Sequence, residues 1–287
     1  MTPTSLDQSV ETFAHLTQSL TDADLDRAWA WGDYESEGVR FAFFRVYEEL
    51  RTLAVQLAHL SASSGRPPSS AKRILALYHA AYRDLQAALL GVPAELFEYP
   101  PAEGDWPIRR VLKHIVSADA AFFAVITHAL NQLRSGVAQP AGLTQAAYDA
   151  ILGIDEAQEE AILTGPLVPF QAFHAALHRR ILRELAGIGE QEMDLPAIFW
   201  ESYPMSLRFR LHRFDAHMRQ HTVQIDKALR DLGQAPTEAR RLLRLIYAAL
   251  AEVEGLLIAA DDLGIDLQQQ TASAIDAFTG EIAPLLG

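Results

Sequence analysis

FDAHMRQHTVQI, residues 214–225, has the apolar spacing of a helix and carries two histidines within one helical turn. His217 and His221 are four residues apart, so a helix places both imidazoles on one face. That face belongs to an apolar stripe that should be turned toward a protein core. A buried imidazole needs partners for its ring nitrogens, and a metal ion shared by two histidines is one such partner. The apolar members of the stripe are Leu207, Leu211, Phe214, Met218, Ile225, Ala228 and Leu232.

The same helical period recurs along most of the chain, and no segment shows the sustained alternation of a strand. Four long helices are expected, over residues 70–91, 105–134, 166–185 and 206–233. Two of their connections are long, as in bundles with crossover connections. The sequence therefore predicts an all-α protein, a four-helix bundle with additional N- and C-terminal helices.

One stretch, SASSGRPPSS at residues 61–70, has the composition of a linker. We therefore expect a helical N-terminal extension over residues 1–65 and the bundle over residues 66–235. Residues 236–287 are expected to form a C-terminal helical hairpin packed on the bundle. The extra helices at both ends could also serve homodimer formation.

The net charge of −13 disfavours a nucleic-acid partner, because phosphate binding needs a basic surface. The chain has no cysteine, which excludes disulfides, zinc–thiolate sites and a cysteine nucleophile. The N-terminus has neither the basic start nor the apolar run of a signal peptide. Continuous apolar stretches such as 248–251 and 256–260 are too short to span a membrane. We therefore expect a cytoplasmic protein without a membrane partner.

A third metal ligand must come from another helix, since two histidines do not complete a site. His114 is the best candidate, because it lies on the apolar stripe of the second long helix. Asp119, five residues later, is rotated off that stripe. Three neutral imidazoles with an open position would suit Zn²⁺, Ni²⁺ or Fe²⁺. Gln224 lies one turn beyond His221, where its amide either holds a histidine ring in place or is simply exposed to water.

A rival pair, His174 and His178, has the same spacing in the third long helix. Arg179 and Arg180 follow it directly and would repel a divalent cation if they faced the same way. We expect this pair to be polar groups on a partly solvated face.

Two further features bear on chemistry. Met218 follows His217 where the HExxH metalloproteases have a glutamate base, so a metalloprotease is disfavoured. Phe199, Trp200 and Tyr203 form an aromatic cluster in an expected loop, which either lines a substrate pocket or serves packing. No residue stands out as catalytic.

The stretch EGDWPIRRVLKHIVSAD, residues 103–119, is followed about a hundred residues later by HMRQHTVQI, residues 217–225. Together they resemble the DinB-like superfamily. Its members are four-helix bundles with one histidine on the second helix and two, spaced by four, on the fourth. The resemblance implies that His114, His217 and His221 are the metal ligands.

Other positions support the resemblance or depart from it. Trp106 matches the tryptophan that precedes the second helix in the family, and Gln224 with Ile225 matches its Gln-Ile pair. Pro107 stands where Ser or Thr usually caps the second helix, which leaves Asp105 to cap it. Val223 stands where the family often has glycine.

The resemblance also implies candidate functions. Relatives include S-transferases that join a low-molecular-weight thiol to an electrophile, and a mycothiol-dependent isomerase. A divalent ion that binds the thiol sulfur favours the thiolate at neutral pH. The alternatives are a metal-dependent hydrolase, in which the ion activates water, and a non-catalytic bundle with a structural histidine cluster. The fold alone does not choose among them.

Overall fold

The computed structural model describes residues 5–34, 37–65, 67–138, 140–199 and 203–286. Helices dominate these residues, which confirms the predicted all-α fold. The chain divides into two compact units. The terminal unit comprises Met1–Pro67, Tyr82–Val92 and Gly233–Gly287, and the bundle unit comprises Pro68–Ala81 and Pro93–Leu232. Helix α4 (Ser70–Leu89) contributes residues to both units.

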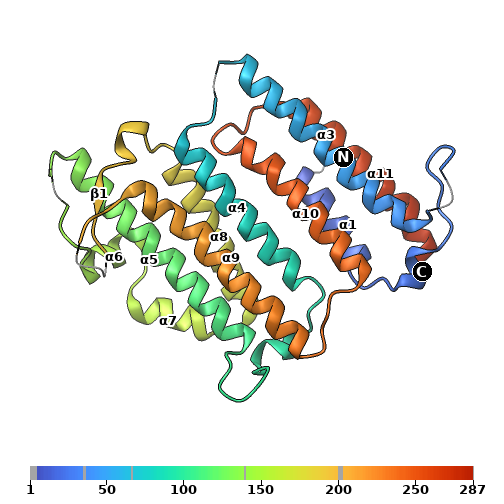
Figure 1. Ribbon diagram of the computed structural model, residues 1–287, viewed down its shortest axis with the longest axis horizontal. Helices are drawn as coiled ribbons and strands as arrows, with labels where there is room; N and C mark the ends of the chain where they lie inside the picture. Colours follow the sequence, from blue (N-terminus) through green and yellow to red (C-terminus); the bar gives the residue numbers. More distant parts are fainter. Residues whose placement is uncertain (1–4, 35–36, 66, 139, 200–202, 287) are drawn as a thin grey trace. The chain divides into compact units, whose positions relative to one another are not determined.

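The bundle unit is built on α5 (Ile108–Arg134), α8 (Leu167–Leu185), α9 (Leu207–Asp231) and the first part of α4. Helices α5 and α9 lie side by side and run in opposite directions (Figure 1). Helix α5 also contacts α8. Each long helix turns an apolar face inward, so the centre of this unit is filled mainly with aliphatic and aromatic side chains.

The connections of the bundle unit contain short elements. They are η1 (Ala94–Glu98), α6 (Gln145–Leu152), α7 (Glu156–Thr164), η2 (Glu190–Glu192), β1 (Pro196–Ala197) and β2 (Met205–Ser206). The two strands are antiparallel and pair Pro196 with Ser206, so the segment expected to be only a loop before α9 is partly ordered by hydrogen bonds. The backbone N–H of Leu207 also donates to Leu195 O, which satisfies a donor that the first turn of a helix leaves free.

The terminal unit brings both ends of the chain together. Its helices are α1 (Leu6–Thr17), α2 (Asp22–Leu25), α3 (Val39–Ser63), α10 (Glu238–Leu257) and α11 (Ile265–Leu286). Helix α3 packs against α10 and α11, and α1 packs against α11, around a core of their own. The division into 1–65, 66–235 and 236–287 stays a prediction, to which the structure adds that the two flanks share this core.

A buried arginine joins three helices of the terminal unit. Arg83 is 7% exposed, and its guanidinium donates a hydrogen bond to Glu254, 2.8 Å from Nε to Oε2. It also forms ion pairs with Asp7 and Glu11. A buried guanidinium needs such partners, because an unpaired charge in the interior is costly.

Helix α5 departs from two expectations. It begins after Pro107, at a cap without a side-chain hydrogen bond, so the prediction that Asp105 caps it is wrong. The fixed φ of Pro107 suits the start of a helix without such a bond. Helix α5 is also long and apolar enough to cross a membrane by length and composition. Its apolar character is spread over the helix and is not one long continuous stretch, so the sequence analysis did not predict it. Of its most apolar window, 61% is buried inside the structure, as in the core helix of a bundle.

Candidate metal centre

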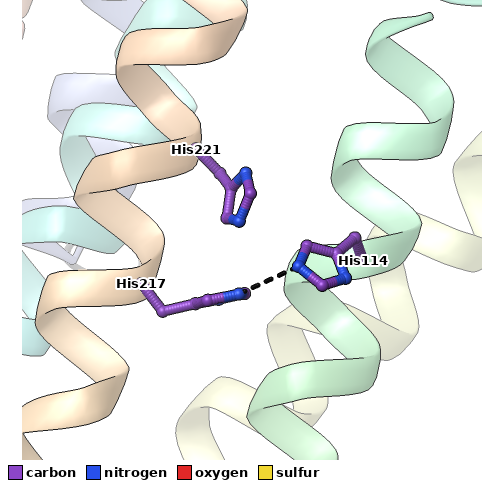
Figure 2. Close-up of side chains that lie close together, drawn as sticks. All are labelled: His114, His217 and His221. Carbon is purple, nitrogen blue, oxygen red and sulfur yellow. Dashed lines mark hydrogen bonds between the residues drawn. The ribbon is translucent and has the colours of Figure 1, made fainter. Parts of the chain in front are cut away.

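Three histidines converge between α5 and α9 (Figure 2). His114 comes from α5, and His217 and His221 come from successive turns of α9. Nε2 of His217 lies 3.1 Å from Nε2 of His114. One nitrogen from each of the three rings lies within 4.8 Å of the other two. The structure therefore brings together the three side chains that the sequence proposed as ligands.

The local structure explains why these rings meet. Ser206 caps α9 by accepting a hydrogen bond from Phe209 N, which fixes the start of the helix and the phase of its apolar stripe. With the stripe buried, His217 and His221 are only 6% and 7% exposed. His114, in contrast, is exposed, so the cluster opens to solvent on the side of α5.

The hydrogen bond of His221 leaves its inward nitrogen free to bind a metal. Its Nδ1 lies 2.8 Å from Gln224 Oε1. Because Oε1 can only accept a hydrogen bond, Nδ1 carries the proton and Nε2 keeps its lone pair. This contact is the ring-holding contact considered for Gln224, and such contacts orient metal-binding histidines in other proteins.

Burial favours the neutral form of two of the rings. It lowers the pKa of His217 to about 3, with further lowering by the charges of His221, His114 and Arg213. His114 is exposed as a residue, but partial desolvation of its ring lowers its pKa, and His221 lowers it further. Neutral imidazole is the form that binds metal ions, so protons compete weakly for these rings at neutral pH.

The spacing of the His114 and His217 rings fits a transition-metal ion. Two nitrogens, each about 2.1 Å from one ion, are about 3.0 Å apart at a right angle and about 3.4 Å apart at a tetrahedral angle. The observed 3.1 Å lies between these limits. Across the described residues the group has three members, which leaves a coordination position open. These residues therefore fit Zn²⁺, Ni²⁺ or Fe²⁺ as a donor set.

The family model of the DinB superfamily matches residues 77–225, a little over half of the chain. The chain belongs to the DinB superfamily. The match contains all three histidines and ends at Ile225, directly after Gln224. No curated protein and no solved structure matches the chain. Helices α1, α2, α3, α10 and α11 lie outside the matched residues of this DinB-superfamily protein.

Aromatic rings border the DinB triad on two sides. The Trp106 ring lies at 79° to the His114 ring, with centroids 5.5 Å apart. The Phe122 ring is perpendicular to the His217 ring, with centroids 5.7 Å apart. The centroid of the Phe199 ring lies 6.0 Å from that of Phe122. Nδ1 of His217 is buried without a hydrogen-bond partner in the described structure, so contacts such as that with Phe122 hold this ring.

The aromatic residues proposed for a substrate pocket have separate outcomes. Phe199 is half-buried and lies beside Phe122, one ring away from the triad. Tyr203 is 56% exposed, and Trp200 lies outside the described residues. A hollow of about 50 Å³ lies elsewhere, at the Gln224 side of the triad, and neither Phe199 nor Tyr203 lines it. Its lining residues are Pro101, Asp105, Trp106, Gln224, Lys227, Ala228 and Asp231.

A second polar cluster is buried in the same unit, in an environment that differs from the predicted one. His174 and His178 are 6% and 2% exposed, so the prediction of a partly solvated face is wrong. Nε2 of His174 lies 3.6 Å from Asp119 Oδ2, and Nε2 of His178 lies 2.9 Å from His79 Nδ1. The direct neighbours Arg179 and Arg180 do not share this environment because successive helical residues point about 100° apart.

Tyr78 and Asp119 complete this buried cluster. Both are 0% exposed, and the Tyr78 hydroxyl donates to Asp119 Oδ2 at 2.7 Å. Burial raises the pKa of Asp119, while His174 and Tyr78 act in the opposite direction. Asp119 was not predicted as a metal ligand because it lies on a different face of its helix from His114. The structure confirms this difference, since Asp119 faces α4 and α8 and not the triad.

Proposed function

We propose that this DinB-superfamily protein binds one divalent transition-metal ion at His114, His217 and His221. We further propose that it is an S-transferase, which joins a low-molecular-weight thiol to an electrophile. The convergence of three imidazoles is the observation that carries both statements. Held there, the ion would bind the thiol sulfur and favour its thiolate.

The residues of the chain have distinct roles in this proposal. The three imidazoles supply neutral nitrogen donors, and Gln224 fixes the tautomer of His221 through the 2.8 Å bond. Phe122 and Trp106 limit the access of water to the rings that they border. The exposed edge at His114 admits the substrates. In the reaction, the sulfur forms a bond to the electrophilic carbon, the leaving group departs with its electron pair, and the thiol proton passes to solvent.

Elemental analysis of the purified full chain tests the metal. We expect about one transition-metal ion per chain, and loss of that ion in both His114→Ala and His217→Ala. His212→Ala is the matched control, because His212 is an exposed histidine on the same helix. A wild-type chain that stays metal-free when offered Zn²⁺, Ni²⁺ and Fe²⁺ contradicts the proposal and supports a non-catalytic bundle.

Product analysis tests the reaction class. The metal-loaded protein is incubated with a panel of thiols and an alkylating electrophile, and thioethers are measured by mass spectrometry. We expect thioether formation above the uncatalysed rate, and its loss in His217→Ala. Hydrolysis of the electrophile without a thioether would instead identify a metal-dependent hydrolase.

A further inference from the structure

Arg213 lies one helical turn before His217 on the same face of α9. Its guanidinium carbon is 5.9 Å from the centre of the Phe122 ring, and that ring is 5.7 Å from the ring of His217. Arg213 and His217 therefore flank the same aromatic side chain.

Apart from its contact with the Phe122 ring, the guanidinium of Arg213 has no partner among the described residues. It is half-buried, yet it forms no hydrogen bond and no ion pair with any residue that the structure describes. Other arginines of α9 are used differently: Arg219 pairs with Asp215, and Arg230 pairs with Asp231. A half-buried guanidinium with unused donors is free to form bidentate hydrogen bonds with a carboxylate.

The charge around the triad points to the same kind of ligand. The donor group consists of three imidazoles and contains no carboxylate among the described residues. A divalent ion placed there would be repelled by Arg213. A thiolate alone compensates one positive charge, and a second anionic group on the same molecule would compensate the arginine.

We propose that Arg213 binds a carboxylate of the thiol substrate, so that this site selects acidic low-molecular-weight thiols. The sulfur lies at the triad and the carboxylate lies beside Phe122, against the guanidinium. This inference rests on the proposed function, because it places the sulfur at the metal site. It names the class of thiol, which the triad itself does not specify.

Thiol binding to the full chain loaded with Co²⁺ tests this inference without an activity assay. Thiolate coordination is followed by the sulfur-to-cobalt charge-transfer absorption, and a dissociation constant is measured for each thiol. The two probes are 3-mercaptopropionate and 3-mercapto-1-propanol, which have the same chain length and differ in the carboxylate. The variants are Arg213→Gln and, as a matched control, Arg179→Gln. Arg179 is exposed and without a partner in the described structure, so the control removes the same charge.

We expect the wild type and Arg179→Gln to bind 3-mercaptopropionate roughly tenfold more tightly than the alcohol, as for one charge-assisted contact. We expect Arg213→Gln to bind the two thiols equally. Equal binding by the wild type, a result that does not depend on any variant folding, would overturn the inference alone. A preference that persists in Arg213→Gln would also overturn it, because the carboxylate would then bind elsewhere. Failure to bind Co²⁺ would overturn the proposed function and this inference together.

Discussion

Tyr78→Phe tests a buried hydrogen bond in the bundle unit. The substitution removes only the hydroxyl that donates to Asp119 Oδ2 at 2.7 Å. The ring stays, and so do its contacts with the rings of Phe214 and His178, whose centroids lie 4.9 Å and 4.7 Å from that of Tyr78. Because a single oxygen atom is lost, the cavity that remains is too small to dominate the effect.

The magnitude follows from the burial of both partners. Tyr78 and Asp119 are each 0% exposed, so water does not replace the lost donor. A hydrogen bond to a buried carboxyl group contributes on the order of 2 kcal/mol, and we expect the free energy of unfolding to fall by about that amount. The exposed Tyr99 supplies the matched control: Tyr99→Phe should change it by less than about 0.5 kcal/mol.

Native-state hydrogen exchange of α5 amides is the assay, because it reports on the bundle unit separately from the terminal unit. A loss of about 2 kcal/mol corresponds to roughly 30-fold faster exchange of the slowest α5 amides. Urea unfolding of the full chain provides a second measurement. Exchange in Tyr78→Phe that stays within about twofold of the wild type would show that this hydrogen bond does not stabilise the bundle.

Three other predictions concern the metal centre, pH and the terminal unit. Gln224→Leu removes the acceptor for His221 Nδ1 and should weaken metal binding about 10- to 100-fold in a chelator competition, whereas Gln220→Leu on the exposed side of the same helix should not. The pKa of Asp119 is raised in the folded state, so its contribution to stability is fully present below its ordinary value of 3.8 and is lost as pH rises through the folded value. The excess stability of the wild type over Asp119→Asn in urea unfolding should therefore fall as pH rises from about 4; a constant difference would contradict this sign. Arg83→Met leaves three carboxylates without their shared cation and should lower the free energy of unfolding by about 3 kcal/mol, which thermal denaturation would detect.

The long helices of the bundle unit were predictable because their signals are local. Apolar spacing and terminal residues predict α5, α8 and α9 to within a few residues of their observed ends. The two short strands before α9 were not predictable in the same way. They have two residues each, and their pairing depends on how the chain returns to the start of α9.

The candidate site was predictable only in part. The spacing of His217 and His221 predicts a shared face, and the apolar stripe of the second long helix, together with the resemblance, indicated His114 as the third ligand. Arg213 carries a sequence signal as well, since it precedes His217 by four residues. That no described carboxylate pairs with it is visible only in the folded chain. The hydrogen bond between the Tyr78 hydroxyl and the Asp119 carboxyl group could not be predicted from the sequence around either residue.

By itself, the sequence determined the helices, the two-histidine face of α9 and the absence of cysteine chemistry, because these depend on residue type and on short spacings. Tertiary structure decided which faces meet. It placed His114 against His217, buried His174 and His178 beside Asp119, and grouped both ends of the chain around one core. The physical reason is that burial and pairing depend on contacts between segments far apart in the sequence. Helical periodicity shows which face of a helix is buried, but it does not show which helix packs against that face.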